Sequence, residues 1–91
     1  MKEIVVVHGP QRHELDALGV FGWPVWHKGV SEFPWTYGEP ETCYFLDGEV
    51  TVVPSAGEPI TMGKGDLVIF PTGLSCTWQV TRPVRKHYRF G

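Results

Sequence analysis

Short runs of alternating apolar and polar residues follow one another along most of this chain, separated by turns rich in glycine and proline. The clearest alternation lies in residues 31–37, 76–81 and 84–90. Short apolar runs of similar length occur at residues 4–7, 60–62 and 67–70. A period of two is typical of β-strands that bury one face. Several such strands with almost no helical pattern predict an all-β fold, either an antiparallel sandwich or a small barrel.

Two segments depart from this simple strand pattern. Residues 11–18 have the spacing of a single short helix that ends at Gly19. Pro34 lies inside the run 31–37. Because proline has no N–H to donate to a neighbouring strand, we expect that strand to lie at a sheet edge or to contain a bulge.

The dipeptide Asp47-Gly48 is the strongest local signal, since it separates two β-rich runs. It predicts a type I′ hairpin that joins residues 42–46 to residues 49–53. Cross-strand partners share a face, so this register defines one apolar face for the hairpin. The residues of that face are Cys43, Phe45, Val50 and Val52. Extending the alternation back by two residues points Glu41 into the same interior.

Two further strands add residues to this predicted interior. Alternation in 76–81 points Cys76, Trp78 and Val80 inward, whereas Thr77, Gln79 and Thr81 point outward. In the last strand, one face carries Val84, Lys86, Tyr88 and Phe90. A buried carboxylate without a partner is costly. We therefore expect Lys86 to pair with Glu41 inside the barrel.

Length, charge and cysteine content narrow the class of protein. The chain has 91 residues, which we interpret as one domain over residues 1–91. A formal charge of −2 gives no basic surface for nucleic acid or an anionic membrane. No apolar run approaches the roughly 20 residues of a membrane span, and the N-terminal apolar run is too short for a secretory signal. Two cysteines make no disulfide framework, so we expect a cytoplasmic protein.

Glycines and a few other residues recur at a recognisable spacing. The first frame runs from Gly29 over five residues to Trp35-Thr36-Tyr37, then over three to Glu41 and over six to Gly48. The second frame places Gly65, Pro71, Gly73, Cys76 and Val80 in order at residues 65–80.

These frames resemble the two motifs of the cupins. More narrowly, the stretches TCYFLDGEVTV, GDLVIFPTGLSCTW and PVRKHYRF are similar to small single-domain cupins related to (S)-ureidoglycine aminohydrolase and to the ethanolamine-utilisation cupin. The resemblance implies a small jelly-roll β-barrel, the double-stranded β-helix of the RmlC-like type. It also implies a bacterial-type or plant cytoplasmic protein.

The residues depart from that family where cupins hold a metal ion, with three histidines and a glutamate. The histidine positions are Trp35, Tyr37 and Cys76 here, and only Glu41 is retained. Indole nitrogen is not an ordinary metal ligand, and neutral tyrosine is a poor one. We therefore predict no metal and no cofactor. The chain's own histidines lack ligand spacing and are expected on the surface or in loops; they are His8, His13, His27 and His87.

The remaining candidates each have a functional and a structural interpretation. Glu41 is either a general acid or base, with Lys86 or Cys76 assisting, or a structural carboxylate. Cys76 is either a nucleophile or a small buried hydrophobe, and the latter is commoner. The candidate binding residues are Trp35, Tyr37, Cys43 and Trp78, which either line a pocket or only fill the interior.

Three functions follow from these candidates. We predict an aromatic-lined cavity that binds a small polar metabolite, in a metal-independent enzyme that uses Glu41. The alternative is a non-catalytic binding or sensing module. A metal-dependent hydrolase of ureidoglycine type, with altered ligands drawn from Glu41, Cys76 and Cys43, ranks third. Tyr44 and Leu46 leave an apolar outer patch, either a homodimer interface or a surface covered by the chain's own N-terminal strand.

Overall fold

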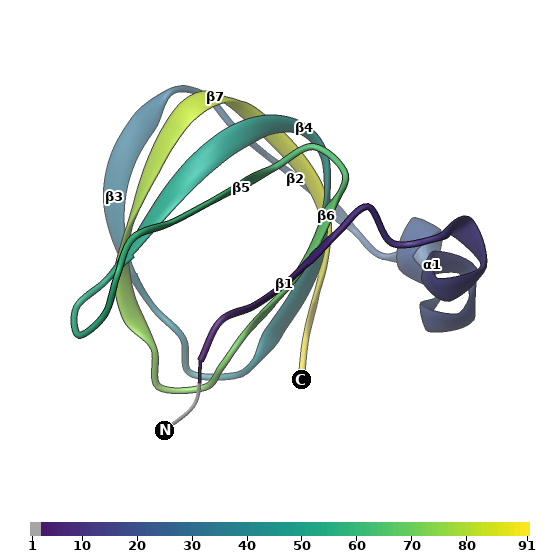
Figure 1. Ribbon diagram of the computed structural model, residues 1–91, viewed down its shortest axis with the longest axis horizontal. Helices are drawn as coiled ribbons and strands as arrows, with labels where there is room; N and C mark the ends of the chain where they lie inside the picture. Colours follow the sequence, from purple (N-terminus) through teal and green to yellow (C-terminus); the bar gives the residue numbers. More distant parts are fainter. Residues whose placement is uncertain (1–2) are drawn as a thin grey trace.

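The strands of this protein form one antiparallel sheet that wraps around a central interior, as Figure 1 shows. The computed structural model of the protein describes residues 3–91. The elements are β1 Val5–His8, α1 Arg12–Leu18, the 3-10 helix η1 Val20–Gly22, β2 Val25–Lys28, β3 Ser31–Thr36, β4 Glu41–Pro54, β5 Ile60–Gly63, β6 Asp66–Phe70 and β7 Ser75–Phe90. The all-β barrel predicted from the sequence is confirmed.

Two long strands, β4 and β7, organise the sheet. They pair with each other from Glu41 opposite Phe90 to Pro54 opposite Cys76. The shorter strands add on either side, in the order β1-β6-β4-β7-β2, with β3 paired to β7 and β5 to β4. Within residues 3–91, β3 has β7 as its one partner. The strand that contains Pro34 is therefore an edge strand, as its missing N–H predicted.

The hairpin predicted at Asp47-Gly48 is wrong, because both runs belong to the single strand β4. Gly48 has a φ of +94° and lies in an irregular stretch where the pairing of β4 with β7 shifts register between Phe45 and Val50. A β-bulge inserts one extra residue, so it shifts the inward alternation by one position, as a two-residue turn would. The predicted inward face is consequently correct: Cys43, Phe45, Val50 and Val52 are completely buried.

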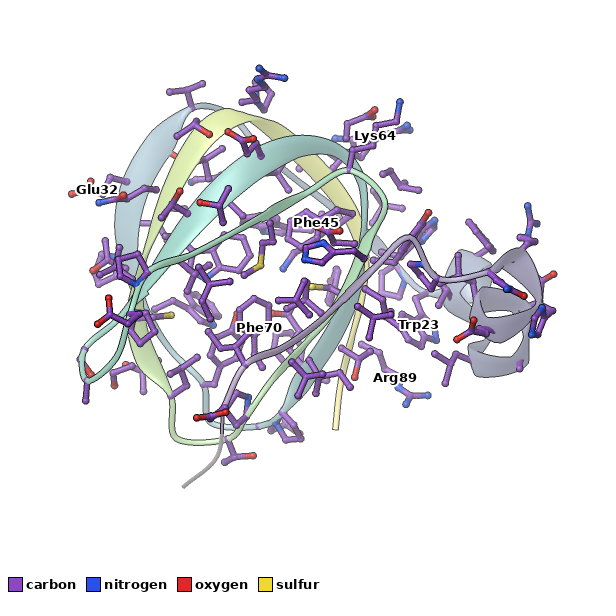
Figure 2. The ribbon with its side chains drawn as sticks, viewed as in Figure 1. Trp23, Glu32, Phe45, Lys64, Phe70 and Arg89 are labelled. Carbon is purple, nitrogen blue, oxygen red and sulfur yellow. The ribbon has the colours of Figure 1, made fainter. Side chains whose placement is uncertain are left out.

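The last two predicted strands are also one element, β7. Its first half pairs with β3 and its second half with β2, while β4 lies along its other side. Trp78 and Lys86 of β7 both lie inside the barrel, and only 2% and 4% of their surfaces are exposed. In Figure 2, Phe45 and Phe70 point into the same interior, whereas Glu32 and Lys64 lie outside the barrel.

A helical segment covers part of the outer surface. Helix α1 ends at Leu18, its C-cap Gly19 adopts a left-handed conformation, and η1 follows directly. This segment forms a second small core with Leu67 and the partly buried Tyr44. Tyr44 is thus covered by the chain's own N-terminal region, although by α1 and η1 rather than by the strand β1. Figure 1 shows this segment on the outside of the barrel.

The same cover explains one incorrect prediction. His87 was expected at the surface or in a loop, but it is 9% exposed and lies under η1. Its Nδ1–H donates a hydrogen bond of 2.9 Å to the carbonyl oxygen of Trp23.

Of the helices between residues 3 and 91, none has the length and apolar character needed to cross a membrane.

Candidate binding site

A buried ion pair joins β4 to β7 inside the barrel. Nζ of Lys86 donates to Oε2 of Glu41 at 2.7 Å, and the two side chains are only 5% and 4% exposed. The hydroxyl of Tyr37 donates to the other carboxylate oxygen, Oε1, at 2.8 Å. Each oxygen of the buried carboxylate therefore has a donor, which offsets much of the cost of taking the charge out of water. This is the pairing expected from the sequence.

Strand register explains how these three side chains meet. Lys86 lies opposite Phe45, two inward positions along β4 from Glu41. The long lysine side chain spans that offset. Tyr37 directly follows β3, whose residues pair with the first half of β7. A backbone hydrogen bond from its N–H to the carbonyl oxygen of Leu74, 2.9 Å long, holds Tyr37 in place.

Aromatic rings surround the lysine ammonium. Nζ of Lys86 lies 4.5 Å from the ring centroid of Trp78, 4.9 Å from that of Trp26 and 5.9 Å from that of Phe45. Within about 6 Å, the negative face of an aromatic ring attracts a cation, and this attraction is stronger when the cation is desolvated. The rings thus replace part of the water that the ammonium loses on burial.

A cavity of about 200 Å³ adjoins this ion pair. Seven of its nine lining residues are aromatic, and the other two are Glu41 and Lys86. The aromatic lining residues are Trp26, Phe33, Trp35, Tyr37, Trp78, Tyr88 and Phe90. Trp35 and Phe90 are 46% and 42% exposed, so they lie where the cavity meets solvent. The arrangement is a half-open aromatic pocket with one buried charge pair among its walls.

The structure brings five of the predicted site residues together and separates two from them. Trp35, Tyr37, Glu41, Trp78 and Lys86 all line the cavity. The two cysteines are buried in the adjacent core and do not line it.

The environment of the cysteines does not favour a nucleophile. Complete burial raises the pKa of Cys43 from 9.0 to about 12. Burial also raises the pKa of Cys76, although the indole of Trp78 partly opposes this, and the Cys76 thiol contacts the carbonyl oxygen of Trp35 at 3.6 Å. A nucleophilic cysteine needs a lowered pKa. At neutral pH both side chains are neutral thiols.

Sequence reasoning missed one wall of the pocket entirely. Trp26 lies on β2, opposite Lys86 of β7, and its ring packs edge-on against Trp78 at a centroid distance of 5.7 Å. In the sequence, Trp26 is a large aromatic residue in a short run between two turns, and this run is too short for alternation to predict which way its side chains point. Alternation in the last strand predicts Tyr88 and Phe90 on its inward face but does not by itself mark them as site residues.

The residues at the cupin metal position do not fit a metal ion. Trp35, Tyr37 and Cys76 occupy the three histidine positions, and both oxygens of Glu41 already accept hydrogen bonds. Burial and the nearby Glu41 raise the pKa of the Tyr37 phenol, so it stays protonated and is a poor ligand. Between residues 3 and 91, no three His, Cys, Asp or Glu side chains form a group that could hold a metal ion.

Comparison with known proteins places the chain in a family. The family model described as "EutQ-like cupin domain" matches residues 15–88. The crystal structure of a DUF861 family protein from Thermotoga maritima is 47% identical, with a TM-score of 0.94, over 98% of this chain and 100% of that one. The comparison with curated proteins gave no match.

Two EutQ proteins share the fold over a part of their length. A putative ethanolamine utilization protein Q from Salmonella typhimurium LT2 is 29% identical with a TM-score of 0.65, and the EutQ protein of Clostridium difficile is 23% identical with a TM-score of 0.66. Each match covers 72% of this chain but only 53% and 52% of those proteins, respectively. With a family match over residues 15–88 and a relative that is similar from end to end, this chain belongs to the EutQ-like cupin domain family.

Proposed function

We propose that this barrel binds a small organic molecule in the aromatic pocket, and that it does so without a metal ion. The observation that carries the proposal is the buried Lys86–Glu41 pair in the wall of a cavity that is otherwise aromatic. Ligand pockets are typically concave and mostly apolar, with a few placed polar groups that orient the ligand. Stability alone does not explain why a core keeps a buried charge pair, since apolar residues often replace such pairs without loss of stability.

Binding is favoured over catalysis by the state of the candidate reactive groups. Both oxygens of Glu41 are engaged by donors, and neither thiol is a thiolate at neutral pH. A general base must be free to reach the proton that it removes. The arrangement therefore supports a binding or sensing module better than the metal-independent enzyme.

An enzyme is the second candidate, because one observation favours it. Tyr37, Glu41 and Lys86 form a continuous hydrogen-bonded chain of ionisable groups that lines the cavity. Such a chain can pass a proton when a ligand displaces one of its members. A bound compound that the wild type converts, and that a Glu41→Gln variant binds but leaves unchanged, would establish this second function.

Ligand-observed NMR with a library of small fragments tests the binding proposal. The test variant is Trp35→Ala, which removes one wall at the mouth of the pocket. The matched control is Ile69→Ala, at a residue on β6 that is 40% exposed and does not line the cavity. Pocket ligands should bind Trp35→Ala at least about fivefold more weakly, because contact with a large aromatic surface is lost, and should bind Ile69→Ala as they bind the wild type.

Three of the four tryptophans line the cavity, so its occupation should also change the protein's fluorescence. Fragment binding that is equally affected by both variants, or that is absent altogether, would contradict a pocket in this place.

A further inference from the structure

The charge pair in the pocket wall has unused hydrogen-bond donors. A lysine ammonium carries three N–H groups. Among residues 3–91, Nζ of Lys86 donates one hydrogen bond to a protein acceptor, the carboxylate of Glu41. Tyr37 donates its single O–H to the same carboxylate. The polar part of the pocket wall therefore has spare donor capacity at Lys86, and a ligand that fits it carries an acceptor.

The charges of the residues that line the cavity sum to zero. Lys86 and Glu41 cancel, and burial keeps Tyr37, Cys43 and Cys76 neutral because it raises the pKa of each. A cationic ligand would meet the ammonium of Lys86, which already occupies the faces of Trp26 and Trp78. An anionic ligand would add a second negative charge beside Glu41, and the residues that line the cavity include no second cation to balance it. A neutral ligand avoids both costs.

The shape of the pocket indicates a ring. An apolar protein cavity of about 150 Å³ is known to hold one benzene molecule, and this cavity of about 200 Å³ is slightly larger. Its walls are aromatic faces and edges, which pack best against flat molecules. Trp78 is one of these walls, and its indole N–H is buried and lacks a hydrogen-bond partner within the described chain.

We propose that the pocket selects an uncharged, flat ring molecule with a carbonyl oxygen, such as an aromatic or cyclic amide. Its carbonyl oxygen accepts an N–H of Lys86, and its ring packs against the aromatic walls. This inference rests on the proposed binding function, and it names the chemical class of the ligand.

Four probes with the same ring separate the possibilities: benzamide, benzoate, benzylammonium and toluene. Affinities are measured by tryptophan fluorescence and ligand-observed NMR at neutral pH. Benzamide should bind at least about tenfold more tightly than each of the others, the difference expected for one hydrogen bond to a charged donor. Tightest binding of benzoate or benzylammonium would overturn the assignment of a neutral ligand. Equal binding of toluene and benzamide would overturn the role of Lys86 as donor.

The variants isolate the donor without leaving a buried charge unpaired. Lys86→Met combined with Glu41→Gln is neutral and similar in volume, so the barrel should remain folded. We expect this double variant to lose the preference, so that it binds benzamide no more than about twofold more tightly than toluene. The control, Lys64→Met, replaces an exposed lysine outside the barrel and should behave as the wild type (Figure 2).

The outcomes also separate this inference from the function on which it rests. A benzamide preference that survives in the double variant contradicts the role of Lys86. If none of the four probes binds the wild type, the ligand class is wrong. The binding function itself still stands in that case, provided that library fragments bind and respond to Trp35→Ala and not to Ile69→Ala.

Discussion

Burial controls the ionisation of the side chains that surround the Glu41–Lys86 pair. The pair itself is held by short hydrogen bonds, and removing one partner of such a buried pair typically costs about 3–5 kcal/mol, because the other charge is left alone. Burial raises the pKa of the neighbouring phenol and thiols, Tyr37, Cys43 and Cys76, so these groups stay protonated. Cys43 has no exposed surface, and its pKa rises to about 12 from an ordinary value of 9.0. Its neutral form is therefore part of the folded state.

We expect alkaline pH to destabilise the barrel through Cys43. The unfolded chain loses the thiol proton near pH 9, whereas the folded chain keeps it until about pH 12. The stability linked to this group is thus complete below pH 9 and declines as the pH rises from 9 to 12, by about 1.4 kcal/mol per pH unit. Urea unfolding at intervals between pH 7 and 11 measures this slope.

Cys43→Ala is the matched variant for this measurement. It should be less stable at pH 7, because it leaves a small cavity, but its stability should fall less steeply above pH 9. The other alkaline groups titrate in both proteins, so they cancel in the difference between the two curves. Parallel curves up to pH 11 would show that Cys43 ionises in the folded barrel as easily as in the unfolded chain.

The irregular stretch of β4 around Gly48 keeps both halves of that strand facing the interior. At Gly48, with its φ of +94°, a Cβ atom would lie 2.2 Å from the carbonyl oxygen of Pro83 on β7. On the other side, a Cβ at Gly63 of β5 would lie 2.4 Å from the carbonyl oxygen of Gly48. Three backbones therefore meet at a distance that excludes side chains. The bulge lets β4 run continuously from the ion pair to the far end of the barrel.

Substitution of Gly48 by alanine should destabilise the barrel strongly. The left-handed conformation alone costs about 1–2 kcal/mol for a residue with a Cβ, and the contact with the backbone of Pro83 adds to this. We expect a total loss of about 2 kcal/mol or more in the free energy of unfolding, measured with urea at pH 7. Gly57→Ala is the control, because its Cβ would make only ordinary contacts of 3.5 Å with Pro54. Equal losses in the two variants would contradict the close approach at Gly48.

At the scale of the whole molecule, this barrel keeps the cupin frame and changes what the frame holds. The barrel places the four positions that hold the metal ion in other cupins, residues 35, 37, 41 and 76, around one interior. In this chain, tryptophan, tyrosine and cysteine occupy three of these positions. Lys86 supplies a positive charge directly to Glu41. The ammonium of Lys86 thus balances the negative charge of Glu41, as a metal ion would in a metal-binding cupin.

We expect zinc to leave the stability of this protein unchanged. If the protein had a zinc site, zinc at about 100 times the Kd of that site would stabilise the fold by about 2.7 kcal/mol. This would raise the Tm by about 10 °C or more for a domain of this size. Thermal unfolding with zinc and with EDTA should instead give the same Tm, and elemental analysis should find less than one metal per chain. A stoichiometric metal that is lost in Glu41→Gln would refute this.

Most of the fold and much of the candidate site could be predicted from the order of residues. Alternation with period two placed Glu41, Trp78 and Lys86 inward, because a strand sends successive side chains to opposite faces whatever its partners are. Two further features could be predicted locally. Gly19 predicts the end of the helix because glycine readily adopts the left-handed conformation, and Pro34 predicts an edge strand because it lacks an N–H. The motif spacing identified the cupin barrel, which the family match supports.

Local sequence could not distinguish a turn from a bulge at Asp47-Gly48. Both can use a glycine with positive φ, as Gly48 has, and both shift the alternation by one residue, so the inward face was right while the connection was wrong. The choice is made by pairing with distant segments: β4 continues because β5, β6 and β7 all supply hydrogen bonds along it.

Which inward residues share one cavity was likewise decided only by the tertiary structure. Closure of the sheet brings Trp26 of β2 and Phe90 of β7 to the pocket and leaves Cys43 and Cys76 in the packed core. The 3-10 helix η1 covers His87, whose position in the sequence is that of an outward strand residue. The sequence by itself determined the faces of the strands and the charges that meet inside, because these follow from local geometry. The strand partners and the shape of the pocket follow from contacts between residues far apart in the chain, which no local pattern encodes.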